Sequence, residues 1–96
     1  MTMLDCDMIR HMLESGAALL DVRNTDEHHR GALPSSKNIP LPLLPVLAHD
    51  HLDKDQQVLV YCHSGARAVM AERILNGLGF NDVTNIGGML HYQDCS

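Results

Sequence analysis

One segment sets the pattern of the whole chain: Val58-Leu59-Val60-Tyr61-Cys62-His63-Ser64-Gly65-Ala66-Arg67. Its first half is a continuous apolar run, which is typical of a strand covered on both faces in a parallel sheet. Small and polar residues follow. From Ala66 onward, apolar side chains recur at helical spacing, at Met70, Ala71, Ile74, Leu75 and Leu78. The segment therefore predicts a strand, a tight loop and a helix, with Cys62 where the strand ends.

The position of Cys62 makes it a candidate nucleophile. Ligands of open parallel sheets bind beyond the carboxyl ends of the strands, and the loop amides and the start of the helix are expected to point at the sulfur. The helix dipole contributes roughly 0.3–1 kcal/mol, whereas lowering a thiol pKa by two units needs about 2.7 kcal/mol. Arg67 and the loop amides must therefore contribute, and Gly65 allows a tight turn. The alternative, a small buried apolar cysteine, is the common state of free cysteines.

The bulk properties restrict the class of protein. Ninety-six residues predict one compact domain covering residues 1–96, and the hydrophobic content of 45% is that of a globular protein. A net charge of −5 argues against nucleic acid or an anionic membrane as a partner. The N-terminal residues lack the pattern of a signal peptide, and no apolar span of ~20 residues occurs. A cytoplasmic location is therefore expected.

The other cysteines and the histidines carry weaker signals. Three cysteines without a Cys-x-x-Cys pair disfavour a disulfide framework or a zinc site and suit a reducing compartment. Cys95 is expected to be a frayed terminal cysteine, the alternative being a resolving thiol for Cys62. The role of Cys6 stays open. Two histidine pairs lack the spacing of a helical metal site, so solvated surface histidines and no metal ligands are expected: His28 with His29, and His49 with His51.

The remaining segments predict further elements in alternation. We expect a helix capped by Asp5 or Asp7 and ending at Ser15-Gly16, with four apolar side chains facing inward: Met8, Ile9, Met12 and Leu13. Strands are predicted at residues 17–22, 37–39 and 82–86. Short helices are expected from about residue 26 and from residue 45 to about residue 51, where Leu44, Leu47 and Ala48 face inward.

Asp21 and Arg23 fall at the end of the first predicted strand, at the same sheet edge as Cys62. The favoured interpretation is structural support of the following loop, for example through an ion pair between Arg23 and Glu27. Direct contact with a ligand is the alternative.

The arrangement Cys-x-x-Gly-x-Arg after an apolar strand resembles the active-site loop of the rhodanese family, the thiosulfate and related sulfurtransferases. Further matching pieces occur in family order: Asp21-Val22-Arg23, Glu27 with Gly31, Leu33-Pro34, Asn38-Ile39-Pro40 and Gly87-Gly88. The chain departs from the family at Ala32 and Ser35, where the family has histidine and glycine, and at Tyr92, where it commonly has tryptophan. The resemblance implies an α/β fold in which a small parallel β-sheet is flanked by helices on both faces, a rhodanese-like three-layer sandwich.

The resemblance also implies a function. A sulfurtransferase would move a sulfane sulfur from a donor such as thiosulfate to a thiol or cyanide acceptor through a persulfide on Cys62. The loop residues would bind the substrate: His63, Ser64, Gly65, Ala66 and Arg67. Asp21 and Arg23 would support the site, and no metal or organic cofactor is required. A sulfur-relay protein is a further expected partner.

Two other functions are open at this stage. A persulfide carrier or partner-binding module would use the same loop without turnover. A cysteine phosphatase-like enzyme is less favoured, because only His63 to Ala66 separate Cys62 from Arg67, one residue fewer than in those enzymes.

Overall fold

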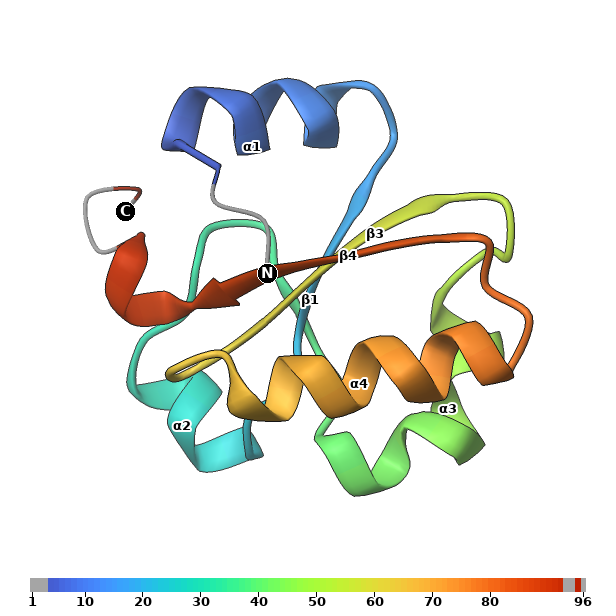
Figure 1. Cartoon of the computed structure of the whole chain (residues 1–96). Coiled ribbons are helices and arrows are strands. Elements are labelled where there is room, and N and C mark those ends of the chain that lie inside the picture. The colour runs from blue at the N-terminus through green and yellow to red at the C-terminus, as the bar shows by residue number, and fades with distance from the viewer. Residues whose placement is uncertain (1–3, 93–94, 96) are drawn as a thin grey trace.

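The computed structural model describes residues 4–92 and 95 (Figure 1). Four parallel strands form one sheet in the order β2-β1-β3-β4. The elements follow one another as α1 (Cys6–Glu14), β1 (Ala18–Asp21), α2 (Thr25–Arg30), β2 (Lys37–Asn38), the 3₁₀ turn η1 (Leu41–Leu43), α3 (Leu44–His51), β3 (Gln57–Cys62), α4 (Ala66–Gly77), β4 (Asp82–Gly88) and the 3₁₀ turn η2 (Met89–His91).

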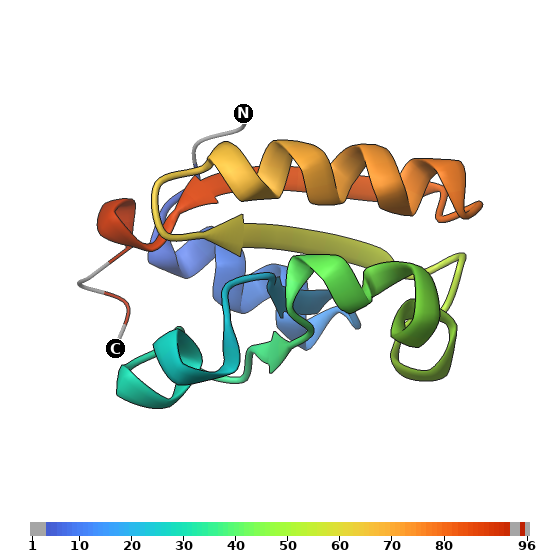
Figure 2. The ribbon, with the colours of Figure 1, turned by 90° about the horizontal axis from the view of Figure 1, so that it is seen from below.

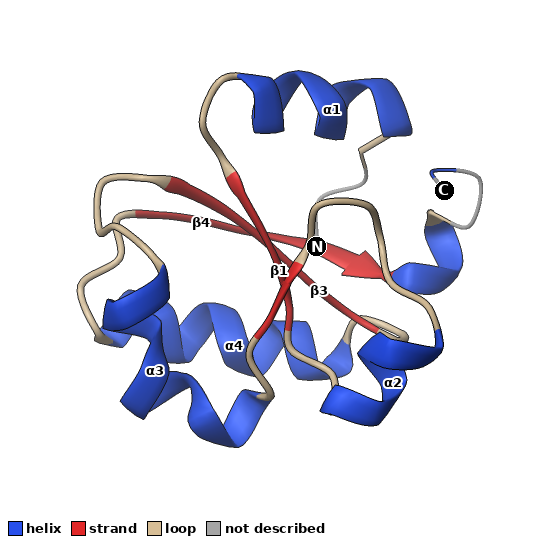
Figure 3. Cartoon of the chain, turned by 180° about the vertical axis from the view of Figure 1, so that it is seen from behind, coloured by secondary structure: helices blue, strands red, loops and turns tan. Residues whose placement is uncertain are grey.

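Helices cover both faces of the sheet, as the sequence predicts. Figures 1 and 3 show α1 on one face and α3 and α4 on the other, and Figure 2 views the molecule from the side of α3 and α4. Alternate residues of β3 face the two layers: Val58, Val60 and Cys62 pack on the α4 side, whereas Leu59 and Tyr61 pack on the α1 side. The predicted α/β class is therefore confirmed, with β3 buried on both faces.

Local sequence signals explain where the helices begin. The carboxylate of Asp5 accepts a hydrogen bond of 2.8 Å from the Met8 amide, which caps α1. The predicted inward positions of Met8 and Met70 are wrong, because their side chains are 45% and 49% exposed. In α4 the buried stripe consists of Ala68, Ala71 and Leu75, so the helix packs through small residues and turns Met70 to solvent.

The ends of the chain are joined by a disulfide between Cys6 and Cys95, whose Cα atoms lie 5.3 Å apart. Both the expectation that Cys95 is frayed and the argument against a disulfide are therefore wrong. The physical reason is tertiary: the buried Tyr92 donates a hydrogen bond to the Ile86 carbonyl and accepts one from the Leu4 amide, which brings the ends together over the α1 face. Because Cys95 is paired with Cys6, it is not available as a resolving thiol for Cys62. The number and spacing of the cysteines also no longer argue for a reducing compartment.

Over residues 4–92 and 95, every helix is too short or too polar to cross a bilayer.

Candidate active site

The loop between β3 and α4 holds Cys62 at the start of a helix. Gly65 has a left-handed backbone (φ 108°) and precedes the first residue of α4. Its N–H donates a hydrogen bond of 2.9 Å to the Cys62 sulfur. The sulfur therefore lies against the N-terminus of α4, where amide donors and the helix dipole favour negative charge.

Cys62 itself is 1% exposed and belongs to the apolar cluster on the α4 side, whereas the following His63 and Ser64 are exposed. Such burial is typical of a structural cysteine. The hydrogen bond from the Gly65 amide, in contrast, is typical of a loop that binds an anion at a helix N-terminus. Of the predicted loop residues, Gly65 is the one whose amide the structure aims at the sulfur. A reactant can reach this sulfur only if the loop around His63 and Ser64 moves.

Gly88 packs directly against this loop. A Cβ atom at Gly88 would lie 2.6 Å from the Ser64 Cα and closer still to the His63 carbonyl oxygen. A register shift between Val60 and Tyr61 sets Gly88 opposite Cys62 in the sheet. The strand predicted at residues 82–86 continues through the Gly87-Gly88 pair, which belongs to β4. The contact of Gly88 with the loop could not be predicted from its position in the sequence.

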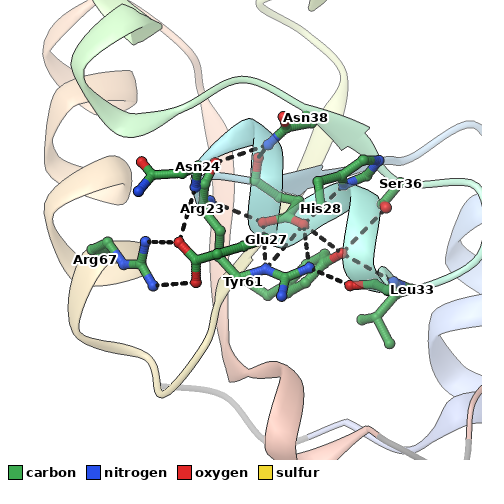
Figure 4. Close-up of polar contacts among 11 residues, drawn as sticks. Arg23, Asn24, Glu27, His28, Leu33, Ser36, Asn38, Tyr61 and Arg67 are labelled. Atoms are coloured by element: carbon green, nitrogen blue, oxygen red, sulfur yellow. Dashed lines mark hydrogen bonds and ion pairs between the residues drawn. The ribbon is translucent and has the colours of Figure 1, made fainter.

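Arg67 is bound to Glu27 of α2 rather than directed at the sulfur. The guanidinium donates hydrogen bonds of 2.7 and 3.0 Å to the two carboxylate oxygens (Figure 4). This contact lowers the pKa of Glu27 to about 2. The pKa of Arg67 is raised, first by Glu27 and to a smaller degree by the charge of Cys62. Arg67 therefore connects the start of α4 to α2 through a charge-assisted, two-bond contact.

At the end of β1, Asp21 forms the centre of a buried polar network, and its partners Arg23, His28 and Tyr61 are labelled in Figure 4. Its carboxylate accepts hydrogen bonds from the Arg23 backbone and guanidinium at 2.7–3.1 Å, from His28 Nδ1 at 2.9 Å and from the Tyr61 hydroxyl at 3.1 Å. Burial raises the pKa of Asp21, but the hydrogen bonds from Arg23 and His28 outweigh it, so that the pKa is lowered. An ionised carboxylate only accepts, so Nδ1 of His28 carries the hydrogen.

This network corrects two expectations. Arg23 pairs with Asp21 and donates to the Gly31 carbonyl at 2.7 Å, so Glu27 is not its partner. His28 is bound to Asp21 and is not a solvated histidine. The network matches the structural-support interpretation of Asp21 and Arg23, since their charges are used within the fold.

A cleft of about 330 Å³ opens beside the loop, and we call it the Arg30 cleft. It is lined by Arg23, Glu27, Arg30, Gly31, His63, Met89 and Leu90. Sequence reasoning missed Arg30, Met89 and Leu90, because no local pattern connects the end of α2 with η2. A smaller hollow of about 210 Å³ lies on the α1 side, beside Cys6 and Cys95. Within the described ranges, no group of three or more histidine, cysteine, aspartate or glutamate residues is placed to hold a metal ion.

Comparison with known proteins places this geometry in a family. The family model described as Rhodanese-like domain matches residues 5–95. The chain is 34% identical over 70 residues to a sulfurtransferase of Allochromatium vinosum, covering 73% of this chain and 64% of the relative. It is 34% identical over 68 residues to a putative sulfur carrier protein, YrkF, of Bacillus subtilis, covering 71% of this chain and 36% of the relative. The chain thus spans less than two thirds of the length of these two relatives.

Solved structures agree with the fold. A rhodanese from Escherichia coli, solved with anions, superimposes with a TM-score of 0.72 at 30% identity, covering 78% of this chain and 89% of that one. The family model also matches nearly the whole sequence. The chain belongs to the rhodanese-like domain family.

Proposed function

We propose that this domain transfers a sulfane sulfur from a donor such as thiosulfate to a thiol or cyanide acceptor, through a persulfide on Cys62. The observation that carries the proposal is the hydrogen bond from the Gly65 amide to the Cys62 sulfur, at the N-terminus of α4. The same helix end favours a thiolate and then a persulfide anion. Membership of the rhodanese-like family supports this assignment.

In the loading step, the Cys62 thiolate attacks the outer sulfur of thiosulfate. A new S–S bond forms, the S–S bond of the donor breaks, and sulfite leaves with its electron pair. The persulfide places its charge on the outer sulfur, where amides of residues 63–67 would stabilise it as an oxyanion hole stabilises oxygen. Cyanide or a thiol then takes that sulfur, and Cys62 returns to the thiolate.

The burial of Cys62 adds a requirement to this mechanism. Because the sulfur is almost fully covered, the loop must yield to admit a donor. His63 and Ser64 are the exposed loop residues and therefore the ones that would meet it. Two contacts limit this movement: Gly88 against the loop, and the ion pair between Arg67 and Glu27.

The test replaces Cys62 with serine, whose hydroxyl can still accept the Gly65 hydrogen bond. Cys62→Ser is expected to keep the circular dichroism spectrum of the unmodified protein and to lose thiosulfate:cyanide transfer completely. Intact mass measured after incubation with thiosulfate should show a gain of one sulfur atom only when Cys62 is present. A folded Cys62→Ser protein that retains most of the transfer rate would contradict the proposal.

A carrier function is the second candidate, and the likeness to a protein named as a putative sulfur carrier favours it. A carrier would receive the sulfur on Cys62 and hand it to a partner in a sulfur relay. The same mass measurement separates the two functions. A gain of one sulfur with negligible turnover to cyanide or thiols indicates a carrier, whereas turnover indicates an enzyme. Phosphatase chemistry is less favoured still, because Arg67, the cation of the loop, is paired with Glu27.

A further inference from the structure

The Arg30 cleft has an uneven distribution of charge. Of the arginines beside the loop, Arg23 is bound to Asp21 and Arg67 is bound to Glu27. Arg30 also lines the cleft but makes no ion pair within residues 4–92 and 95. Among the described residues that line the cleft, Arg30 is therefore the cation left without an ion-pair partner, in a chain whose net charge is −5. An anionic group is therefore the ligand that this part of the cleft favours.

Another part of the cleft wall is apolar, because Met89 and Leu90 line it. The Leu90 side chain lines the cleft and is 52% exposed, so its apolar surface is accessible to a ligand there. Met89 is partly buried, and its terminal methyl group lies 3.9 Å from the position that a Cβ atom on Gly31 would take. This is an ordinary van der Waals distance, so the Met89 side chain lies beside Gly31, the residue that caps the end of α2. A fully inorganic anion such as thiosulfate has no group that would use this wall.

Taken together, these features fit a ligand with an anionic end and a short apolar stem, and the proposed transfer requires its sulfur to lie near the loop. We propose that the Arg30 cleft binds the thiol acceptor of the reaction, that this acceptor is a small organic thiol bearing a carboxylate, and that Arg30 determines the preference for it. The inference rests on the proposed sulfur transfer and adds the class of acceptor. His63 lies next to Cys62 in the chain, so a ligand in the cleft sits beside the loop that carries the persulfide.

The chemical step is balanced without another reactant. The acceptor thiol attacks the outer sulfur of the Cys62 persulfide anion, forms a new S–S bond and gives its proton to that outer sulfur. The bond between the two sulfurs of the persulfide breaks, and its electron pair leaves with Cys62 as the thiolate. The proton stays on the transferred sulfur, so that the product is an organic hydropersulfide. Arg30 takes no part in the bond changes and acts as a specificity-determining residue.

The test measures single-turnover removal of sulfur from the loaded protein. Wild type, Arg30→Gln and Arg30→Glu are loaded with thiosulfate, freed of donor, and mixed with mercaptopropionate or with the neutral thiol mercaptoethanol. For each acceptor the rate of a variant is divided by that of wild type, which cancels the intrinsic reactivity of the thiol. Arg73→Gln is the matched control, since Arg73 is an exposed arginine of α4 outside the cleft.

Arg30→Gln is expected to slow the reaction with mercaptopropionate about three- to tenfold, the range of a partly exposed charge contact, and Arg30→Glu more strongly. The rate with mercaptoethanol should change less than about twofold, and added salt should reduce the difference between the two acceptors. Equal losses with both thiols, or the same loss in Arg73→Gln, would overturn the assignment of the cleft.

A binding measurement separates this inference from the proposed function. The unloaded protein is titrated with the methyl thioether of mercaptopropionate, which cannot react, while amide resonances are followed by NMR. Shifts centred on Arg30, His63 and Leu90 that disappear in Arg30→Glu are expected. Absence of such shifts contradicts the cleft assignment. Absence of sulfur gain from thiosulfate in wild type contradicts the transfer function instead.

Discussion

Two neighbouring strands end at the same edge of the sheet, but their last residues are held in different ways. At the end of β1, the buried Asp21 accepts hydrogen bonds from Arg23, His28 and Tyr61. At the end of β3, the equally buried Cys62 accepts one from the Gly65 amide. The bonding capacity of the carboxylate is filled, whereas a sulfur at a helix N-terminus has capacity left. In the proposed sulfur transfer, the end of β1 is the rigid support and the end of β3 carries the reactive group.

The largest effect is expected where the β1 network loses its charge. Asp21→Asn leaves the guanidinium of Arg23 buried without a carboxylate, and breaking a buried pair in this way costs about 3–5 kcal/mol. Urea unfolding should show this loss. Asp26→Asn, at an exposed position of α2, is the control and should change the free energy of unfolding by less than about 0.5 kcal/mol. A loss below about 1 kcal/mol for Asp21→Asn would show that this network is not the rigid support.

The disulfide between Cys6 and Cys95 contributes to the stability of the fold without involving the last residues of β1 or β3. Replacing Cys6 and Cys95 with serine together should lower the free energy of unfolding by about 2–4 kcal/mol, because the bond closes a loop with a sequence separation of 89. Transfer to cyanide should stay within about twofold of wild type at temperatures where the variant is folded. A strong loss of transfer in the folded variant would mean that the reactivity of Cys62 at the end of β3 depends on the disulfide between the chain ends.

Gly88→Ala should affect the β3 end through its loop. The added Cβ collides with backbone atoms of His63 and Ser64, which cannot rotate away as a flexible side chain would. We expect a loss of stability of about 1–3 kcal/mol and a fall in the transfer rate of about tenfold or more. Gly77→Ala is the matched control: nothing lies within 4 Å of its added Cβ, and the helix should gain roughly 0.5–1 kcal/mol. An unchanged transfer rate in Gly88→Ala would contradict the role of loop position.

The smallest effect concerns the ion pair that joins the two sides of the site. The pKa of Glu27 is lowered from 4.5 to about 2 by Arg67, so its contribution to stability is present above pH 4.5 and disappears as the pH falls toward 2. Because the pair is partly exposed, we expect at most about 1 kcal/mol. The difference in unfolding free energy between wild type and Glu27→Gln, measured at several pH values, should shrink over this interval. A difference that stays constant with pH would show that the pair does not stabilise the fold.

Much of the fold follows from local patterns. The β3–loop–α4 segment, the cap at Asp5 and the place of Asp21 and Arg23 at a strand end are signals from residues close together in the sequence. Helical spacing was less reliable at Met8 and Met70. Helical spacing shows which side of a helix is apolar, but not which residues of that side face the sheet most directly. In α4 these are Ala68, Ala71 and Leu75, and the two alanines allow the helix to approach the sheet closely.

The amino-acid sequence was enough to identify the strand and the loop with Cys62, because apolar periodicity and capping act between near neighbours. The α/β class with helices on both faces followed from the resemblance to the rhodanese family. The partners of the charged and sulfur-bearing side chains were settled by folding. Arg67 meets Glu27 across a sequence separation of 40, and Cys6 meets Cys95 across 89. Such pairs depend on the order of the strands in the sheet and on the course of the chain ends, which bring distant segments together and which no local pattern encodes.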